Sequence, residues 1–92
     1  MHEHGQIWKY ELTLTGLQIV HTPRASHFVD FRFQGEVLCL WLYVDAPTPV
    51  DEVEFFILGT GTKTLGLDFG DYLATTHHDG FVWHLFSKMD LK

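Results

Sequence analysis

Cysteine and positive charge are scarce in this chain of 92 residues. The single cysteine, Cys39, excludes an internal disulfide and therefore the disulfide-stapled domains of small secreted proteins. Six basic residues against twelve acidic ones give a formal charge of −6, which disfavours electrostatic binding to nucleic acid or to anionic lipid. The amino terminus also lacks the basic and then apolar pattern of a secretory signal. We therefore expect a cytoplasmic protein with no membrane or nucleic-acid partner.

Long apolar stretches are missing as well. The run 37–44 has eight apolar residues, which is too short to cross a bilayer as a helix and rich enough in β-formers for a buried strand. Its residues would alternate between two faces, and both faces are apolar, so both need cover. One face would carry Leu38, Leu40, Leu42 and Val44, and the other Cys39, Trp41 and Tyr43. This run is expected in the middle of a sheet.

The chain contains enough apolar residues to form one hydrophobic core. The apolar fraction is 46%, and a charged fraction of 20% argues against disorder. Ninety-two residues make one domain, 1–92, with mobile tails expected at 1–5 and 88–92.

Alternation of apolar and polar residues predicts strands, and no segment favours a helix. The fold expected is all-β, with six or seven mostly antiparallel strands in a small barrel or a two-layer sandwich. In the first strand Trp8, Tyr10, Leu12 and Leu14 would point inward. The segment 59–70 holds four of the eight glycines and is expected to be a long loop. The strands are predicted at 7–14, 17–22, 27–33, 37–44, 53–58, 71–78 and 81–86.

Two hairpins set the register. A two-residue turn at Gly35-Glu36 pairs Phe33 with Leu38, Phe31 with Leu40 and Val29 with Leu42, whereas a three-residue turn would shift the facing. The opposite face would then hold Phe28, Asp30 and Arg32 beside Tyr43, Trp41 and Cys39. Asp79-Gly80 is a strong hairpin signal, and it pairs Thr75 with His84 and His77 with Val82.

Several segments occur in the same order as in a family of small uncharacterised phage and prophage proteins, which the chain resembles over nearly its whole length. These are Ile7-Trp8-Lys9-Tyr10-Glu11-Leu12, Cys39-Leu40-Trp41 to Val44-Asp45, Gly59-Thr60-Gly61, and Gly80 to His84 ending at Phe86. Thr62 stands where that family has a histidine, and Asp79-Gly80 replaces a Gly-Gly turn. The resemblance implies a context of mobile elements and host defence, and no mechanism.

Neither a metal centre nor a catalytic site is predicted. Of the seven histidines, His77 and His78 are neighbours on one strand and point to opposite faces. Only His77 and His84 share a face, where we expect a histidine bonded to Thr75 or to a backbone carbonyl rather than a metal ligand. Cys39 is expected in the core, where its thiol would be unreactive. The acidic pairs lie in exposed-looking loops that would not desolvate them, so neither an enzyme nor a bound cofactor is expected. These pairs are Asp51-Glu52 and Asp68 with Asp71.

Two functions remain open. The first is non-catalytic docking onto a basic site of a host protein, as an inhibitor of host defence, through residues Asp45, Asp51, Glu52, Glu54, Trp41, Tyr43 and Arg32. The alternative is a small-molecule binder that sequesters a cyclic nucleotide signal, with Trp41, Tyr43 or Trp83 stacked on a base and Arg32 near phosphate. Its anion and ligand contacts would be Gly59, Thr60, Gly61, Thr62, Lys63, Trp83 and His84. The apolar residues on both faces of 37–44 and 81–86 also predict a homo-oligomer, most simply a dimer.

Overall fold

The computed structural model describes residues 5–14, 16–45 and 49–91. These residues form seven strands and no helix, which confirms the all-β prediction. No helix in this part of the chain could therefore span a lipid bilayer. The strands are β1 (Gln6–Leu12), β2 (Gly16–Pro23), β3 (Ser26–Gln34), β4 (Val37–Val44), β5 (Val50–Gly59), β6 (Asp71–His78) and β7 (Phe81–Ser87).

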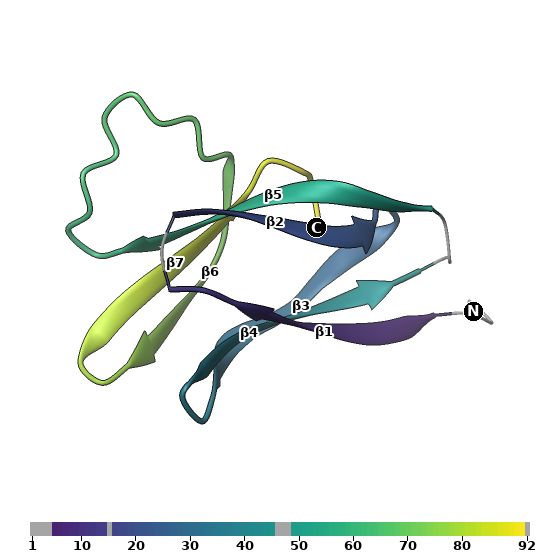
Figure 1. The fold of residues 1–92 in the computed structure, drawn as a ribbon, viewed down its shortest axis with the longest axis horizontal. Helices are drawn as coiled ribbons and strands as arrows, with labels where there is room; N and C mark the ends of the chain where they lie inside the picture. The colour runs from purple at the N-terminus through teal and green to yellow at the C-terminus, as the bar shows by residue number, and fades with distance from the viewer. Residues whose placement is uncertain (1–4, 15, 46–48, 92) are drawn as a thin grey trace.

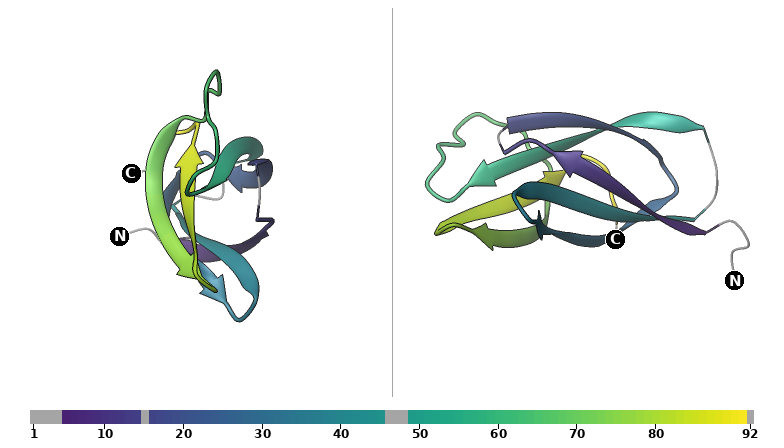
Figure 2. Two further views of the ribbon diagram at one scale, coloured as in Figure 1. Left: turned by 90° about the vertical axis from the view of Figure 1, so that its left-hand side faces the viewer. Right: turned by 60° about the horizontal axis from the view of Figure 1, so that its bottom comes forward.

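The strands form two antiparallel sheets packed as a sandwich, which is one of the two predicted architectures (Figure 1). One sheet has three strands in the order β1-β4-β3, and the other has four in the order β2-β5-β7-β6. On one side of the molecule β6 approaches β3 (Figure 2). The rings of Phe33 and His78 stack there with their centres 4.0 Å apart. The other side, between the edge strands β1 and β2, faces the viewer in Figure 1.

The core lies between the sheets, and β4 occupies the centre of its sheet as predicted. Leu38, Leu40 and Leu42 of β4 are buried against a second set of buried side chains from the other sheet. Burial of each such side chain stabilises the fold by about 1.5–3 kcal/mol. That second set consists of Val53, Phe55 and Ile57 of β5 and Leu85 of β7.

The β3–β4 hairpin follows the predicted register only near its turn. Phe33 pairs with Leu38 and Phe31 with Leu40, but a β-bulge between Phe28 and Asp30 makes Phe28 the partner of Leu42. The predicted pairing of Val29 with Leu42 is therefore wrong. Phe28 packs against the core rather than on the outer face. The extra residue in the bulge exchanges the inward and outward side chains of the strand on the amino-terminal side of it.

The ends of the predicted first strand and of the chain also differ from expectation. Leu14 was predicted to point inward, but β1 ends at Leu12 and Leu14 is 42% exposed. Near the carboxyl end, Leu91 is buried and its carbonyl accepts a hydrogen bond from the Phe28 N–H at 2.8 Å. Met89 and Leu91 of the predicted tail 88–92 thus pack against the core, while residues 1–4 and 92 lie outside the described residues.

The β6–β7 hairpin has the predicted register. Its turn residues Asp79 and Gly80 both have positive φ, 50° and 80°, as a type I′ turn requires. Thr75 pairs with His84 and His77 with Val82. This register places Trp83 on the core side of β7 and His84 on the outer side.

Candidate functional site

The predicted ligand contacts at 59–62 lie beside β7. Gly59 is paired with Trp83 at the end of β5, and the Thr60 N–H donates to the Val82 carbonyl at 3.0 Å. The chain then turns, and the Thr62 N–H donates back to the Gly59 carbonyl at 3.0 Å. This tight turn therefore holds the threonine hydroxyls next to the aromatic residues of β7.

A pocket of about 510 Å³ opens between this turn and the β6–β7 hairpin. Its volume is within the range of roughly 300–1,000 Å³ that is typical of small-ligand sites. A Cβ atom on Gly59 would lie 3.2 Å from Cζ3 of Trp83, so glycine there allows the indole to approach the turn closely. We call this the hairpin pocket; it is lined by Gly59, Thr60, Thr62, Gly80, Phe81, Val82 and Trp83.

Aromatic rings form one wall of the hairpin pocket. The Phe81 and Trp83 rings lie 6.2 Å apart at an angle of 37°, and Phe81 is 65% exposed. A large apolar side chain left this exposed on a hairpin is available to contact a ligand. Together the rings offer a surface on which a flat molecule can stack.

His84 supports the pocket from the outer face without lining it. Its Nδ1 lies 2.9 Å from Thr75 Oγ1 and its Nε2 lies 2.7 Å from Thr60 Oγ1. The Tyr72 hydroxyl continues the chain of contacts, at 2.8 Å from Thr75 Oγ1. This confirms the expected bond to Thr75, and because both ring nitrogens are engaged, His84 holds Thr60 in place.

The structure thus brings together four of the seven predicted ligand contacts, Gly59, Thr60, Thr62 and Trp83. Gly61, Lys63 and His84 are not among the lining residues. The prediction missed Gly80, Phe81 and Val82. These three residues could have been predicted from the Asp79-Gly80 turn. The register that pairs Thr75 with His84 also places this turn beside Trp83.

Trp41, Tyr43 and Arg32 gather elsewhere, on the outer face of the three-stranded sheet. The Arg32 guanidinium carbon lies 5.2 Å from the centre of the Trp41 ring, and Arg32 Nε lies 2.9 Å from Asp30 Oδ2. The ion pair with Asp30 partly neutralises Arg32. None of the three residues lines the hairpin pocket. A small ligand bound in the pocket would therefore contact Thr60 and Trp83 but not Arg32.

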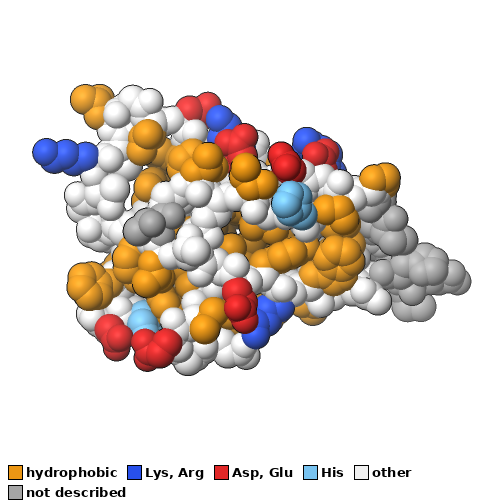
Figure 3. Space-filling model, viewed as in Figure 1, with side chains coloured by type: hydrophobic (Ala, Val, Ile, Leu, Met, Phe, Trp, Pro, Cys, Tyr) orange, Lys and Arg blue, Asp and Glu red, His pale blue; other side chains and the backbone are white. Residues whose placement is uncertain are grey.

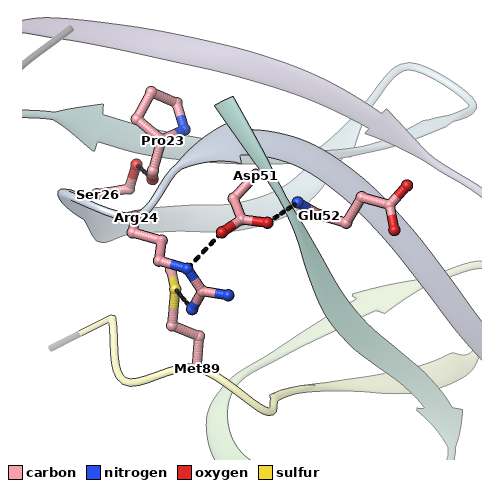
Figure 4. A network of polar contacts seen from close by, with 6 residues as sticks. All are labelled: Pro23, Arg24, Ser26, Asp51, Glu52 and Met89. Atoms are coloured by element: carbon pink, nitrogen blue, oxygen red, sulfur yellow. Dashed lines mark hydrogen bonds and ion pairs between the residues drawn. The ribbon is translucent and has the colours of Figure 1, made fainter. Parts of the chain in front are cut away.

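The acidic pair Asp51-Glu52 was expected in a loop, but both residues lie within β5, as does Glu54. Asp51 is paired with Arg24 at 2.5 Å and also accepts the Glu52 N–H at 2.8 Å (Figure 4). The Arg24 hydrogen bond, the Glu52 N–H and the Arg24 charge hold the pKa of Asp51 below its usual value.

Two other carboxylates lie near histidines. Glu52 Oε2 lies 3.4 Å from His21 Nε2, and Asp45 Oδ2 lies 3.8 Å from His27 Nε2. A notch of about 130 Å³ is lined by both signs of charge, from Arg24, Glu52, Val53, Glu54, Lys88 and Met89. Figure 3 shows the face seen in Figure 1: hydrophobic side chains cross the middle, and along the upper margin acidic side chains lie beside basic ones. At the notch, the acidic residues of β5 therefore lie beside Arg24 and Lys88 rather than forming a purely negative surface.

Comparison with known proteins gives one family. The model of a domain of unknown function, DUF7352, matches residues 4–92. No curated protein and no solved structure matches the chain.

Proposed function

The chain belongs to the DUF7352 family, a domain of unknown function, and we propose that it is a non-catalytic binding protein whose hairpin pocket holds a small ligand with a flat ring, such as a nucleotide. The observation that carries this proposal is the pocket itself. Its size suits a nucleotide, and four residues predicted as ligand contacts line it. The resemblance to phage and prophage proteins supports a finer version, in which the ligand is a cyclic nucleotide signal of host defence.

The lining chemistry supports binding of a ring with polar substituents. Stacking of a base on an aromatic side chain contributes roughly 1–3 kcal/mol and tolerates different bases. Thr62 adds a hydroxyl group that donates or accepts hydrogen bonds, and the Thr60 hydroxyl, which is bonded to His84, keeps a lone pair that can accept one.

The same lining argues against catalysis. None of the seven lining residues has a carboxylate, imidazole, thiol or amine that could serve as a general base. The nearby histidine, His84, already contacts Thr60 and Thr75 through both nitrogens. Binding without chemistry is the function that this set of residues supports.

A thermal shift series tests the proposal. Mononucleotides and cyclic di- and trinucleotides are added to the wild type, to Phe81→Ala and to Ile7→Ala, which alters a side chain with a similar exposed fraction, 60% against 65%. A ligand at one hundred times its dissociation constant stabilises the fold by about 2.7 kcal/mol. We expect a shift in the wild type and in Ile7→Ala that is reduced in Phe81→Ala. Equal shifts in all three proteins would place the ligand elsewhere, and no shift with any nucleotide would reject a nucleotide ligand.

A second candidate is docking to a basic site of a host protein, and the exposed carboxylates Glu52 and Glu54 on β5 favour it. The pairing of Asp51 with Arg24 reduces the negative charge of this surface, so we rank it after the pocket. The test is the association rate of a Lys/Arg-rich peptide with the wild type and with Asp51→Ser, Glu52→Ser and Glu54→Ser combined. Docking predicts a slower rate in the variant and in salt above ~0.15 M, where the Debye length is about 8 Å. An unchanged rate would reject this surface.

A further inference from the structure

Three possible metal ligands converge where the turns of the two hairpins meet. Nε2 of His78 lies 3.1 Å from Oε2 of Glu36 and 3.2 Å from Oδ2 of Asp79. The three ligand atoms all lie within 4.8 Å of one another. Glu36 belongs to the β3–β4 turn of one sheet, whereas His78 and Asp79 belong to the β6–β7 hairpin of the other. No local sequence pattern predicts this cluster, because Glu36 is 42 residues away from His78.

We propose that Glu36, His78 and Asp79 form a binding site for a divalent transition-metal ion such as Zn²⁺. One imidazole nitrogen and two carboxylate oxygens are ligands that Zn²⁺ accepts at about 2.0–2.2 Å, and three protein ligands leave a position for water. Tetrahedral ligands at such distances are separated from one another by roughly 3.3 Å. The two separations from Nε2 are close to that value, so an ion could enter with small side-chain movements.

The imidazole is held in position before any ion arrives. The His78 ring stacks on Phe33 with 13° between the planes, and its side chain is 23% exposed. The carboxylates are open to solvent, with exposed fractions of 84% for Glu36 and 73% for Asp79, so an ion can reach them. The two carboxylates also attract a cation to the imidazole.

The proposed ion would join the two sheets. The contacts already present there include the stack between Phe33 and His78 and the hydrogen bond between His78 and Glu36. An ion bound by both hairpins binds the folded chain only, and so it should raise the melting temperature. This site differs from the hairpin pocket, since none of its three residues lines that pocket, and it does not depend on the proposed nucleotide.

The experiment is a titration with Co²⁺, followed by its visible absorption, and then competition with Zn²⁺. It uses the full chain carrying His2→Ala and His4→Ala, which removes two histidines that lie outside the described residues. Into this background we introduce Glu36→Gln, Asp79→Asn or His78→Ala, and His77→Gln as the control. Asn tolerates the positive φ of position 79, and both carboxylate changes are on exposed side chains, so these two variants should remain folded.

We expect one equivalent of Co²⁺ to bind the background protein and the His77→Gln control, and Zn²⁺ to displace it and raise the melting temperature. Each of the other three changes should weaken binding by at least about tenfold, since even loss of a group that only orients a metal ligand costs about 10–100-fold. No binding to the background protein would overturn the proposal, and so would unchanged affinity in Glu36→Gln and Asp79→Asn. Equal weakening in His77→Gln would point to a loose surface histidine and would overturn it as well.

Discussion

Asp51 illustrates how exposed carboxylates are stabilised in this molecule. The hydrogen bond from Arg24, the Glu52 N–H and the Arg24 charge lower its pKa. The same arrangement recurs at Asp68, where the hydrogen bond and charge of Lys88 lower the pKa of the carboxyl. Each pair ties β5 or the 60–70 loop to another segment: Arg24 lies in the β2–β3 turn, and Lys88 follows β7.

The lowered pKa of Asp51 determines how the stability of the fold depends on pH. A carboxylate whose pKa is lower in the folded state stabilises the fold above its unfolded pKa of about 3.9, and this contribution is lost as the pH falls through the folded value. We therefore expect Asp51→Asn to lower the urea midpoint at neutral pH and to leave it unchanged at acid pH below the folded pKa. The effect should shrink at high salt, because the pair is exposed.

The control is Asp71→Asn, an exposed aspartate at the start of β6. Urea unfolding followed by tryptophan fluorescence across this pH range measures both variants. An equal loss of midpoint for Asp51→Asn at neutral and acid pH would contradict the role assigned to the Arg24 pair.

At the scale of the element, alternation and turn chemistry predicted most of the fold. The strands at 71–78 and 37–44 and the loop after Gly59 agree with the structure, because period-two alternation and turn glycines are local signals. The bulge at Val29 was not predicted. Alternation holds from Val29 to Phe33 and breaks where Phe28 and Val29, both apolar, follow one another. That break alone does not indicate an extra residue, and only the packing of Phe28 in the core together with Leu42 reveals it.

The candidate site was predictable in part. The Gly59 to Thr62 turn and Trp83 were identified from residue type, and the Asp79-Gly80 turn fixed the hairpin that completes the pocket. The separation of Arg32 and Trp41 from the pocket depends on which strand joins which sheet, and no local pattern specifies that. The meeting of Glu36 with His78 is likewise a product of the packing between sheets.

Gly70 and Gly66 offer a matched test of the loop before β6. Both have nearly the same positive φ, 83° and 82°, so alanine at either position carries a similar backbone strain of about 1–2 kcal/mol. At Gly70 a Cβ atom would also lie 2.2 Å from the Ser87 carbonyl oxygen, whereas at Gly66 nothing lies within 4 Å. We expect Gly70→Ala to cost ~1–3 kcal/mol more than Gly66→Ala, from overpacking. Equal free energies of unfolding in urea would show that Gly70 does not approach β7 this closely.

At the scale of the whole molecule, the four-stranded sheet leaves an apolar row on its outer face. Leu17 is paired with Phe56, Phe56 with Phe86, and Phe86 with Tyr72, so the row crosses all four strands. Leu17 and Tyr72 are 50% and 52% exposed, while Phe69 covers part of Phe86 with ring centres 4.6 Å apart. The row includes Phe86, one of the apolar residues of 81–86 from which a homo-oligomer was predicted.

We expect this face to form the predicted homodimer, which should bury about 1,200 Å² or more in total. Leu17→Glu should then convert the dimer to a monomer, because it places a charge in the apolar row. Ile7→Glu, on an outward side chain of the other sheet with an exposed fraction of 60%, should leave the dimer intact. Sedimentation velocity at micromolar concentration measures all three proteins. A monomeric wild type would contradict the prediction, and a dimer sensitive only to Ile7→Glu would move the interface to the three-stranded sheet.

The most direct test of ligand binding in the hairpin pocket uses the three tryptophans as positional probes. Trp83 lines the pocket, Trp41 lies on the outer face of the other sheet and Trp8 lies in β1, so their indole N–H signals report on three regions in one ¹H–¹⁵N NMR titration. With a cyclic dinucleotide, and with a mononucleotide in parallel, we expect saturable shifts of the Trp83 indole and of the Gly80 amide, and a constant Trp41 signal. Shifts centred on Trp41, or no shift of Trp83 at millimolar nucleotide, would contradict the proposed site.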